Sequence, residues 1–205
     1  MKRTLDFLFT ATLMLTLTLI IAVMPTERDA AIYEDTVRLH ILANSDSEED
    51  QELKYVIRDM LLKKYASRLA DANSPEDAKN DVTLLCSEIE SDVESWLLEL
   101  GYSYGCDVTV GSEWYDTREY DDFTLPSGYY TSLRVMLGEA DGQNWWCVMY
   151  PPLCLDIASE EAPRDDATIG YTDEEYRLIT KDGYNVKFKI LELISESIAF
   201  SSKNS

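Results

Sequence analysis

The fold depends first on residues 128–150, which read GYYTSLRVMLGEADGQNWWCVMY. Two runs rich in β-branched and aromatic residues flank the dipeptide Asp141-Gly142, a combination typical of a β-hairpin turn. The register of this hairpin pairs Leu137 with Trp146, Val135 with Val148, and Leu133 with Tyr150. These pairs form one continuous apolar face, which we expect to lie in the core.

The other face of the predicted hairpin is also rich in large side chains. It carries Arg134, Met136, Trp145, Cys147 and Met149. A strand needs only one apolar face, so this second face is either covered by a helix or is a docking surface. Pro151 and Pro152 follow and end the strand, because proline has no N–H to donate to the ladder.

Residues 36–43, TVRLHILA, predict another strand. Val37, Leu39, Ile41 and Ala43 fall on one face, and Arg38, His40 and Leu42 fall on the other. The following NSDSEED segment (44–50) has acids at alternate positions, as a calcium loop does. Glu49 stands where that loop needs glycine, and Tyr55 where it needs a bidentate acid, so the segment predicts a helix start instead. The capping box is Ser45 with Glu48 or Ser47 with Asp50.

Helices follow on both sides of a strand-rich middle. Periodicity predicts one helix to about residue 69 and a second from Pro75 to Gly101. Strands are expected from 106 to about 122, with a hairpin at Gly111-Ser112. After an acidic loop (156–168), Thr172 and Glu175 form a capping box, and residues 185–198 form a terminal helix. The sequence predicts an α+β domain over 31–198, with a mainly antiparallel sheet packed by helices and a frayed tail at 199–205.

The amino-terminal thirty residues differ from the rest. Lys2 and Arg3 precede a charge-free apolar run from Phe7 to Met24. This pattern predicts a signal peptide or a membrane anchor over residues 1–30, with the following domain exported. Pro25 and the sequence around Ala30 leave cleavage open.

The charge balance excludes several partners. The 205 residues include 18 Lys+Arg and 39 Asp+Glu, a formal net charge of −21. Such a surface repels nucleic acid and anionic lipid, so neither is expected as a partner.

Export would place the four cysteines in a compartment where disulfides can form. Cys147 and Cys154 close a short loop, and we predict a disulfide between them, worth roughly 2.5 kcal/mol in the chain-entropy model. The pairing of Cys86 and Cys106 stays open. With one histidine and no Cys-x-x-Cys pair, no metal site is expected.

The chain lacks the usual signatures of catalysis. His40 is the one histidine, and its acidic partner would be Asp46 or Glu139. No nucleophile elbow, zinc-protease motif or phosphate loop is present. We therefore expect a binding protein with no catalytic residue and no cofactor.

Two segments resemble the stage II sporulation protein R family. They are RLHILANSDSEEDQELKYVIRD (38–59) and LPSGYYTSLRVMLGEADGQNWWCVMYPPLC (125–154), and the terminal VKFKILEL is similar to the family's end. The motif residues are Asn44, Ser45, Asp46, Glu139, Asn144, Trp146, Pro151 and Pro152. Ala140-Asp141 departs from the glycine-richer turn of the family.

The resemblance implies a specific function. Members are made in the forespore, exported to the space between forespore and mother cell, and activate a membrane-embedded aspartic protease, stage II sporulation protein GA. That protease cuts the precursor of sigma-E, so this family is a signal and not an enzyme. Export agrees with the signal or anchor segment, which would hold the protein at the membrane if uncleaved.

The second face is the expected contact with the protease, because aromatic, Met and Arg side chains are enriched at interface centres. The predicted contact residues are Trp145, Arg134, Met136, Met149, His40 and Arg38. Asn44, Ser45 and Asp46 are either a strand-to-helix cap or further contacts. The alternative function is an exported cell-envelope hydrolase that uses His40 with an acidic partner. The oligomeric state is not predicted.

Overall fold

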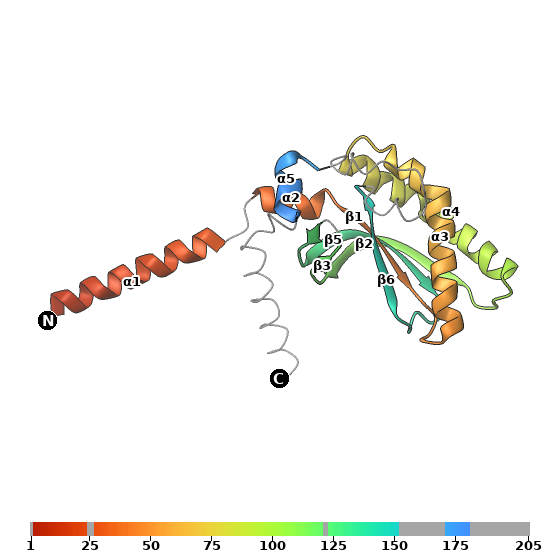
Figure 1. Ribbon diagram of the computed structural model, residues 1–205, viewed down its shortest axis with the longest axis horizontal. Helices are drawn as coiled ribbons and strands as arrows, with labels where there is room; N and C mark the ends of the chain where they lie inside the picture. The colour runs from red at the N-terminus through yellow and green to blue at the C-terminus, as the bar shows by residue number, and fades with distance from the viewer. Residues whose placement is uncertain (1, 24–26, 121–122, 152–170, 181–205) are drawn as a thin grey trace.

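The computed structural model describes residues 2–23, 27–120, 123–151 and 171–180 (Figure 1). Its helices are α1 (Lys2–Val23), α2 (Glu27–Glu34), α3 (Glu48–Ala70), α4 (Pro75–Glu99) and α5 (Asp173–Ile179). Its strands are β1 (Val37–Leu42), β2 (Cys106–Tyr115), β3 (Arg118–Glu119), β4 (Thr124–Leu125), β5 (Gly128–Leu137) and β6 (Asn144–Tyr150). The predicted α+β class is confirmed. The predicted acidic loop, terminal helix and tail lie outside the described residues.

The helix boundaries follow from local signals in the sequence. Ser74 accepts a hydrogen bond from the Asp77 N–H and caps α4, and Gly101 follows the helix with φ of 89°. The capping box of Thr172 and Glu175 begins α5 as predicted. In contrast, no separate helix was predicted over α2, which lies where the signal or anchor segment meets the domain.

The main sheet is mixed, with strand order β2-β5-β1-β6. β1 runs parallel to β5, whereas the β2–β5 and β1–β6 pairs are antiparallel. A separate small sheet pairs β3 with β4. The prediction of a mainly antiparallel sheet therefore needs one correction, the parallel pair at its centre.

The predicted hairpin of residues 128–150 is wrong, because β1 lies between its two strands. The connection from β5 to β6 crosses the end of β1 rather than turning tightly. There the Asp141 N–H donates to the Asn44 carbonyl at 3.2 Å, and the Gly142 N–H donates to the Ala43 carbonyl at 3.0 Å. These bonds occupy the carboxyl end of β1 and hold the connection across it.

The crossing changes which side chains of β6 face the core. Leu39 of β1 lies beside both Leu133 and Cys147, and Ile41 lies beside both Val135 and Trp145. The predicted register placed Trp146 on that face. A shift by one residue exchanges the two faces of a strand, so Trp145 and Cys147 lie on the core side and Trp146 on the other.

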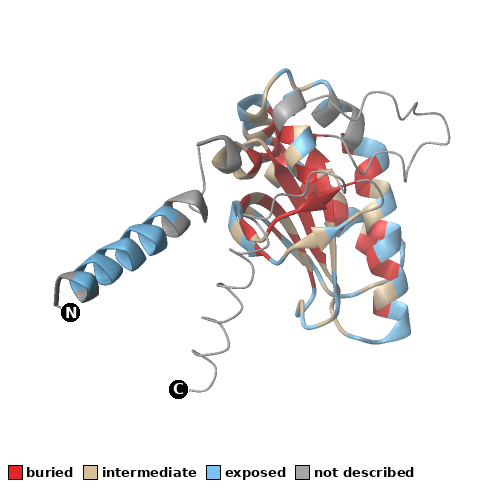
Figure 2. Ribbon diagram, turned by 60° about the vertical axis from the view of Figure 1, so that its left-hand side comes forward, coloured by how far each residue is buried: buried red, intermediate tan, exposed pale blue. Residues whose placement is uncertain are grey.

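Helices α3 and α4 cover one face of the sheet (Figure 1). The residues coloured as buried lie mainly on the strands of the main sheet and on the helices packed against them (Figure 2). The hydrophobic core includes, from the sheet, Leu39, Ile41, Leu133, Val135 and Leu137. From the helices it includes Leu53, Ile57, Leu61, Leu85, Ile89 and Val93.

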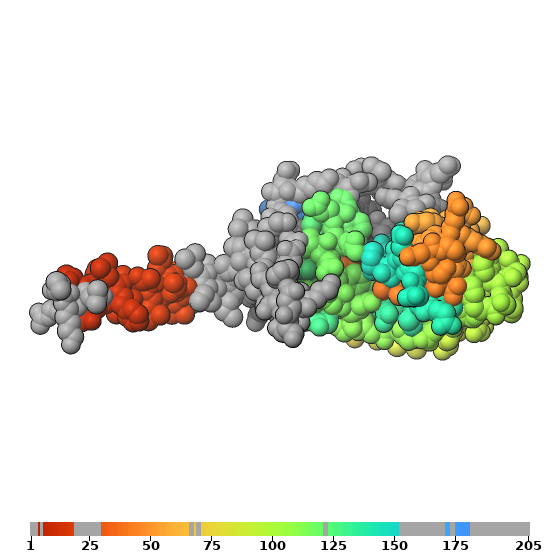
Figure 3. Space-filling model, turned by 90° about the horizontal axis from the view of Figure 1, so that it is seen from below, coloured from red at the N-terminus to blue at the C-terminus, as the bar shows by residue number. Residues whose placement is uncertain are grey.

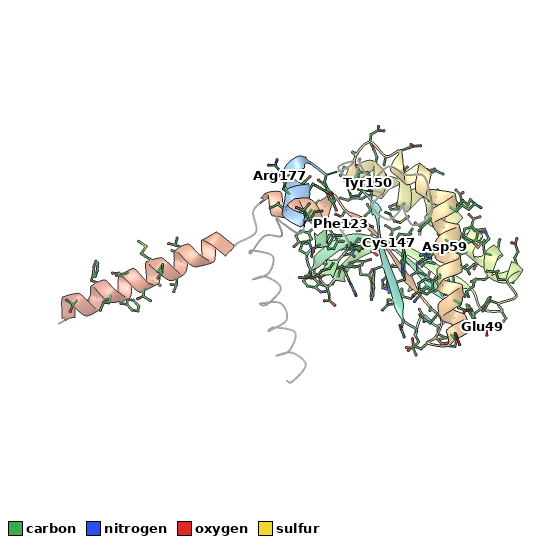
Figure 4. All side chains as sticks on the ribbon, viewed as in Figure 1. Glu49, Asp59, Phe123, Cys147, Tyr150 and Arg177 are labelled. Atoms are coloured by element: carbon green, nitrogen blue, oxygen red, sulfur yellow. The ribbon has the colours of Figure 1, made fainter. Side chains whose placement is uncertain are left out.

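The middle of the chain is simpler than predicted. β2 runs without interruption through Gly111 and Ser112, so the hairpin expected there is wrong. The reversal comes later, between β3 and β4, where the Tyr120 N–H donates to the Phe123 carbonyl at 2.8 Å. Figure 4 shows Phe123 toward α2 and α5, away from Asp59 on α3.

Helix α1 covers most of the predicted signal or anchor segment. Large apolar side chains, among them Phe7, Phe9 and Met14, are exposed along it. Within the part of the chain that is described, none of the helices combines the length and the apolarity needed to cross a membrane.

Candidate functional site

The side of the sheet that points away from α3 and α4 carries a cluster of charged and aromatic residues. Strand register places His40 of β1 between Arg134 of β5 and Trp146 of β6. Side chains from β2 and from the β3–β4 segment complete the cluster. We call this cluster the arginine face, which comprises Arg38, His40, Glu113, Tyr115, Arg118, Tyr120, Arg134 and Trp146.

His40 is held at both ring nitrogens. Nδ1 lies 2.9 Å from Glu113 Oε1, and Nε2 lies 3.0 Å from Asn144 Oδ1. The imidazole stacks on the Trp146 ring with centroids 5.5 Å apart, and only 8% of the side chain is exposed. The acidic partner is Glu113, not Asp46 or Glu139. Because both nitrogens are engaged, His40 joins β1, β2 and β6, which favours a positioning role over that of a free base.

Arg38 is fully buried, and among the described residues no carboxylate lies within ion-pair distance of it. Its Nη2 donates to the Tyr120 hydroxyl at 2.8 Å, and its guanidinium carbon lies 3.9 Å from the centroid of the Tyr115 ring. Burial raises the pKa of the Tyr115 phenol, so the ring stays neutral. Arg38 Nε and Nη1 have no hydrogen-bond partner among the described residues. The charge of Arg38 is therefore stabilised mainly by cation–π contacts with aromatic rings.

The other two arginines are more accessible. The Arg118 guanidinium carbon lies 3.9 Å from the centroid of a Trp146 ring. Arg134 Nε lies 3.3 Å from Glu113 Oε1, an ion pair that lacks hydrogen-bond geometry. Within the described chain, the buried atoms Arg118 Nε, Arg134 Nε and Glu113 Oε2 have no hydrogen-bond partner. Unsatisfied buried polar atoms are uncommon in folded proteins, so their concentration on one face distinguishes this region.

Two of the predicted contact residues do not lie on the arginine face. Trp145 pairs with Ile41, and the guanidinium carbon of Arg58 on α3 lies 5.2 Å from its ring, so Trp145 packs on the helix-covered side. Strand β6 and α3 lie side by side at the surface (Figure 3). Met149 sits at the register shift between Val37 and Arg38 and is buried in the core. The misplaced register of the hairpin explains both errors.

The remaining predicted contact residues do lie together. Register places Met136 on the same side as Arg38, His40 and Arg134, and Met136 is half-buried. Cys147, predicted to share that side, is instead buried against Leu39.

The NSDSEED segment is a structural junction built around Asp50. The Asp50 carboxylate accepts hydrogen bonds from the Ser45 hydroxyl at 2.5 Å, from Asn44 Nδ2 at 2.9 Å and from the Tyr104 hydroxyl at 2.6 Å. Ser47 Oγ accepts from the Asp50 N–H at 3.2 Å, which selects the Ser47–Asp50 pair as the cap of α3.

The same junction holds the connection between β5 and β6. Asn44 Oδ1 accepts from the Glu139 N–H at 3.0 Å, and Asp46 Oδ1 accepts from the Gln143 N–H at 2.8 Å. Asn44, Ser45 and Asp46 therefore form the strand-to-helix junction, in which Ser47 caps α3, while Asn44 and Asp46 also hold this connection.

Asp50 predicts an acid-sensitive fold. Burial would raise the pKa of its carboxyl, but hydrogen bonds from Ser45, Tyr104 and Asn44 outweigh burial and lower the pKa from 3.8 to about 2. A carboxyl whose pKa is lower in the folded state stabilises the fold at pH values above its unfolded-state pKa. That stabilisation is lost as the pH falls through the folded-state pKa. We expect the free energy of unfolding to fall by about 1 to 2 kcal/mol between pH 4 and pH 2, allowing for solvent screening. Urea unfolding across this range measures it, and Asp50→Asn should remove this contribution.

Several residues of the arginine face were not predicted from the sequence. Glu113 and Tyr115 alternate along β2 and share one of its faces, a signal that the wrongly placed hairpin at Gly111 concealed. Arg118 and Tyr120 come from a short segment without periodicity, so only the folded chain brings them to Trp146 and Arg38.

The predictions for the cysteines and the proline pair fall partly on residues that the structure does not describe. Cys86 and Cys106 are free thiols. Cys154 and Pro152 lie outside the described residues, so the Cys147–Cys154 disulfide stays a prediction, whereas β6 ends before Pro151 as expected. Among described residues, no group of three or more His, Cys, Asp or Glu side chains could hold a metal ion.

Comparison with known proteins gives one family. The family model described as stage II sporulation protein R matches residues 33–160. A curated relative, stage II sporulation protein R of Bacillus subtilis (strain 168), is 32% identical over 184 residues, covering 80% of this chain and 82% of the relative. No solved structure matches.

Proposed function

The chain belongs to the stage II sporulation protein R family, and from this premise we propose that it is an exported signal that activates a membrane-embedded protease during sporulation. The protease is an aspartic protease of the stage II sporulation protein GA type, and its substrate is the sigma-E precursor. The protein acts from the space between forespore and mother cell. It reaches that space through its amino-terminal segment, in which Lys2 and Arg3 precede the apolar run.

The observation that carries the contact with the protease is the arginine face. Trp146 is half-buried beneath Arg118 on the side of the sheet that α3 and α4 leave uncovered. Tryptophan and arginine are the residue types most enriched at the energetic centres of interfaces. A side chain as large as Trp146, held between Arg118 and His40, is suited to anchor a partner.

Activation by this surface requires differential affinity. A ligand shifts a two-state protease only by binding the active state more tightly than the inactive state. Moving an equilibrium from 1:99 to 99:1 takes a preference of about 10⁴-fold, or about 5.5 kcal/mol. A few anchor residues of the hot-spot kind supply energies of this order.

Reconstitution in a non-sporulating host tests the proposal. The sigma-E precursor and the membrane protease are co-expressed with this protein, which is either exported or retained in the cytoplasm by deletion of residues 1–30. We expect precursor cleavage, followed by gel shift, only with the exported form. Cleavage with the retained form, or none with folded exported protein and its cognate protease, would contradict the proposal.

The second candidate function is an exported hydrolase, and the contact between His40 and Glu113 favours it. The 2.9 Å distance from Nδ1 to Oε1 is that of an oriented catalytic histidine. Since Nε2 also has a partner in Asn144, we regard this function as the weaker candidate.

His40→Gln separates the two functions. Glutamine keeps hydrogen-bonding groups within reach of Glu113 and Asn144 but cannot act as a general base, whose loss typically costs 10²- to 10⁴-fold. We expect processing to stay within about tenfold of the wild type in the reconstituted system. A loss of a hundredfold or more, with the fold intact by circular dichroism, would favour the hydrolase.

A further inference from the structure

The charge of the arginine face is opposite to that of the chain. The protein has a formal net charge of −21, yet the described residues on this side of the sheet set three arginines, Arg38, Arg118 and Arg134, against the carboxylates of Glu113 and of Asp107, which pairs with Met136. Glu113 already accepts from His40 and pairs with Arg134. Among the described residues of this side, the three guanidinium charges exceed the charge of these two carboxylates.

The hydrogen-bonding inventory points the same way. Arg38 Nε and Nη1, Arg118 Nε and Arg134 Nε are buried donors without hydrogen-bond partners in the described part of the chain. Leaving such a donor unpaired is unfavourable, and more so when the group is charged. Because these atoms are buried, they do not offer direct hydrogen bonds to a partner, but they leave the guanidinium charges of this face incompletely compensated.

Accessibility divides the three arginines into two roles. Arg38 is fully buried and cannot touch a partner without rearrangement, so it supplies a fixed positive charge beneath the surface. The Arg134 side chain is 37% exposed, and Arg118 is half-buried over the Trp146 ring. Arg118 and Arg134 are thus the contact residues; Trp146 lies beneath Arg118 as an apolar platform, and His40 lies between Trp146 and Arg134.

We propose that the arginine face binds an acidic peptide segment of the partner, whose carboxylates are received by Arg118 and Arg134. Guanidinium groups match carboxylates in geometry and charge, and such hydrogen bonds are about twice as strong as neutral ones. This inference rests on the proposed function and adds the chemistry of the partner's contact segment.

The test uses nuclear magnetic resonance of the full ¹⁵N-labelled chain in detergent, which resolves arginine Nε–Hε signals. The probe is the peptide acetyl-Glu-Glu-Glu-Glu-amide, and the control is acetyl-Gln-Gln-Gln-Gln-amide. We expect the acidic peptide to shift the Arg118 and Arg134 signals saturably, and the neutral peptide to leave them unchanged. Arg134→Gln should weaken the acidic peptide at least fivefold. Arg68→Gln, an exposed position on α3, should leave its affinity unchanged.

Three results would overturn the inference. They are no saturable shift, an equal response to the neutral peptide, or equal binding of inorganic phosphate at the same concentration. Reconstituted precursor processing is scored separately. If the acidic peptide does not bind while Trp146→Ala still abolishes processing, the proposal of an acidic partner segment is wrong, but the proposed signalling function is not contradicted.

Discussion

Trp146→Ala is expected to abolish processing of the sigma-E precursor while leaving the fold nearly unchanged. The indole contributes to the arginine face through Arg118 and His40 and is not part of the hydrophobic core cluster. Truncation of an interface anchor costs 2 kcal/mol or more of binding, a loss of at least thirtyfold in affinity. Reconstituted processing measures the signal, and urea unfolding of the same variant measures the fold.

Trp145→Ala is the matched comparison and should do the reverse. Trp145 packs against the core and against Arg58 of α3. Removing a large side chain from such a site costs roughly 3 kcal/mol of unfolding free energy, somewhat less than full burial would give. The variant should lose stability but signal normally at low temperature while folded. Equal effects of the two variants on signalling would show that β6 does not present its faces as described.

Gly142→Ala is expected to destabilise the fold by about 3 kcal/mol or more. A Cβ at this position would lie 2.2 Å from the Ser45 carbonyl oxygen, which is backbone and cannot move aside alone. Relief of the clash would break the hydrogen bond from the Gly142 N–H to the Ala43 carbonyl and lift the connection off the end of β1. Urea or thermal unfolding measures the loss.

Gly111→Ala provides the control for that substitution. A Cβ at Gly111 would meet no atom within 4 Å, and the position lies in a regular strand. Alanine there should be neutral or slightly stabilising, because glycine loses more conformational freedom on folding. If Gly142→Ala were as stable as Gly111→Ala, the close crossing of β1 by the connection would be wrong.

The helices and strands were largely predictable because their signals are local. The alternation in residues 36–43 gave β1, and the apolar periodicity after Ser74-Pro75 gave α4. The cap pattern of Thr172 and Glu175 gave α5. Each of these signals depends on residues only a few positions apart, so β1, α4 and α5 could be predicted without knowledge of tertiary contacts.

Strand pairing was not predictable in the same way. Asp141-Gly142 favours a tight hairpin by local rules, but the end of β1 offers Ala43 and Asn44 carbonyls that bind the connection instead. That competition involves residues almost one hundred positions apart. The wrongly predicted hairpin also affected the candidate site, because it reversed the assignment of Trp145 and Trp146 to the two faces of the sheet.

The candidate site was predicted in part. Arg38 and His40 alternate on β1, so their common face followed from the sequence, and Arg134 joined them through the parallel β1–β5 pair. Glu113 was missed because the predicted hairpin at Gly111 concealed its alternation with Tyr115, and Arg118 could not be predicted, since tertiary packing alone brings it to Trp146.

The central claim is that the arginine face contacts the membrane protease, and site-specific photo-crosslinking tests it most directly. A photoreactive amino acid is placed at Thr109, an exposed position that pairs with Arg134, or at Leu84, which is 76% exposed on α4. Both variants are exported in the reconstituted system. We predict a crosslink to the protease from position 109 and none from position 84. A crosslink from position 84 alone would contradict the account.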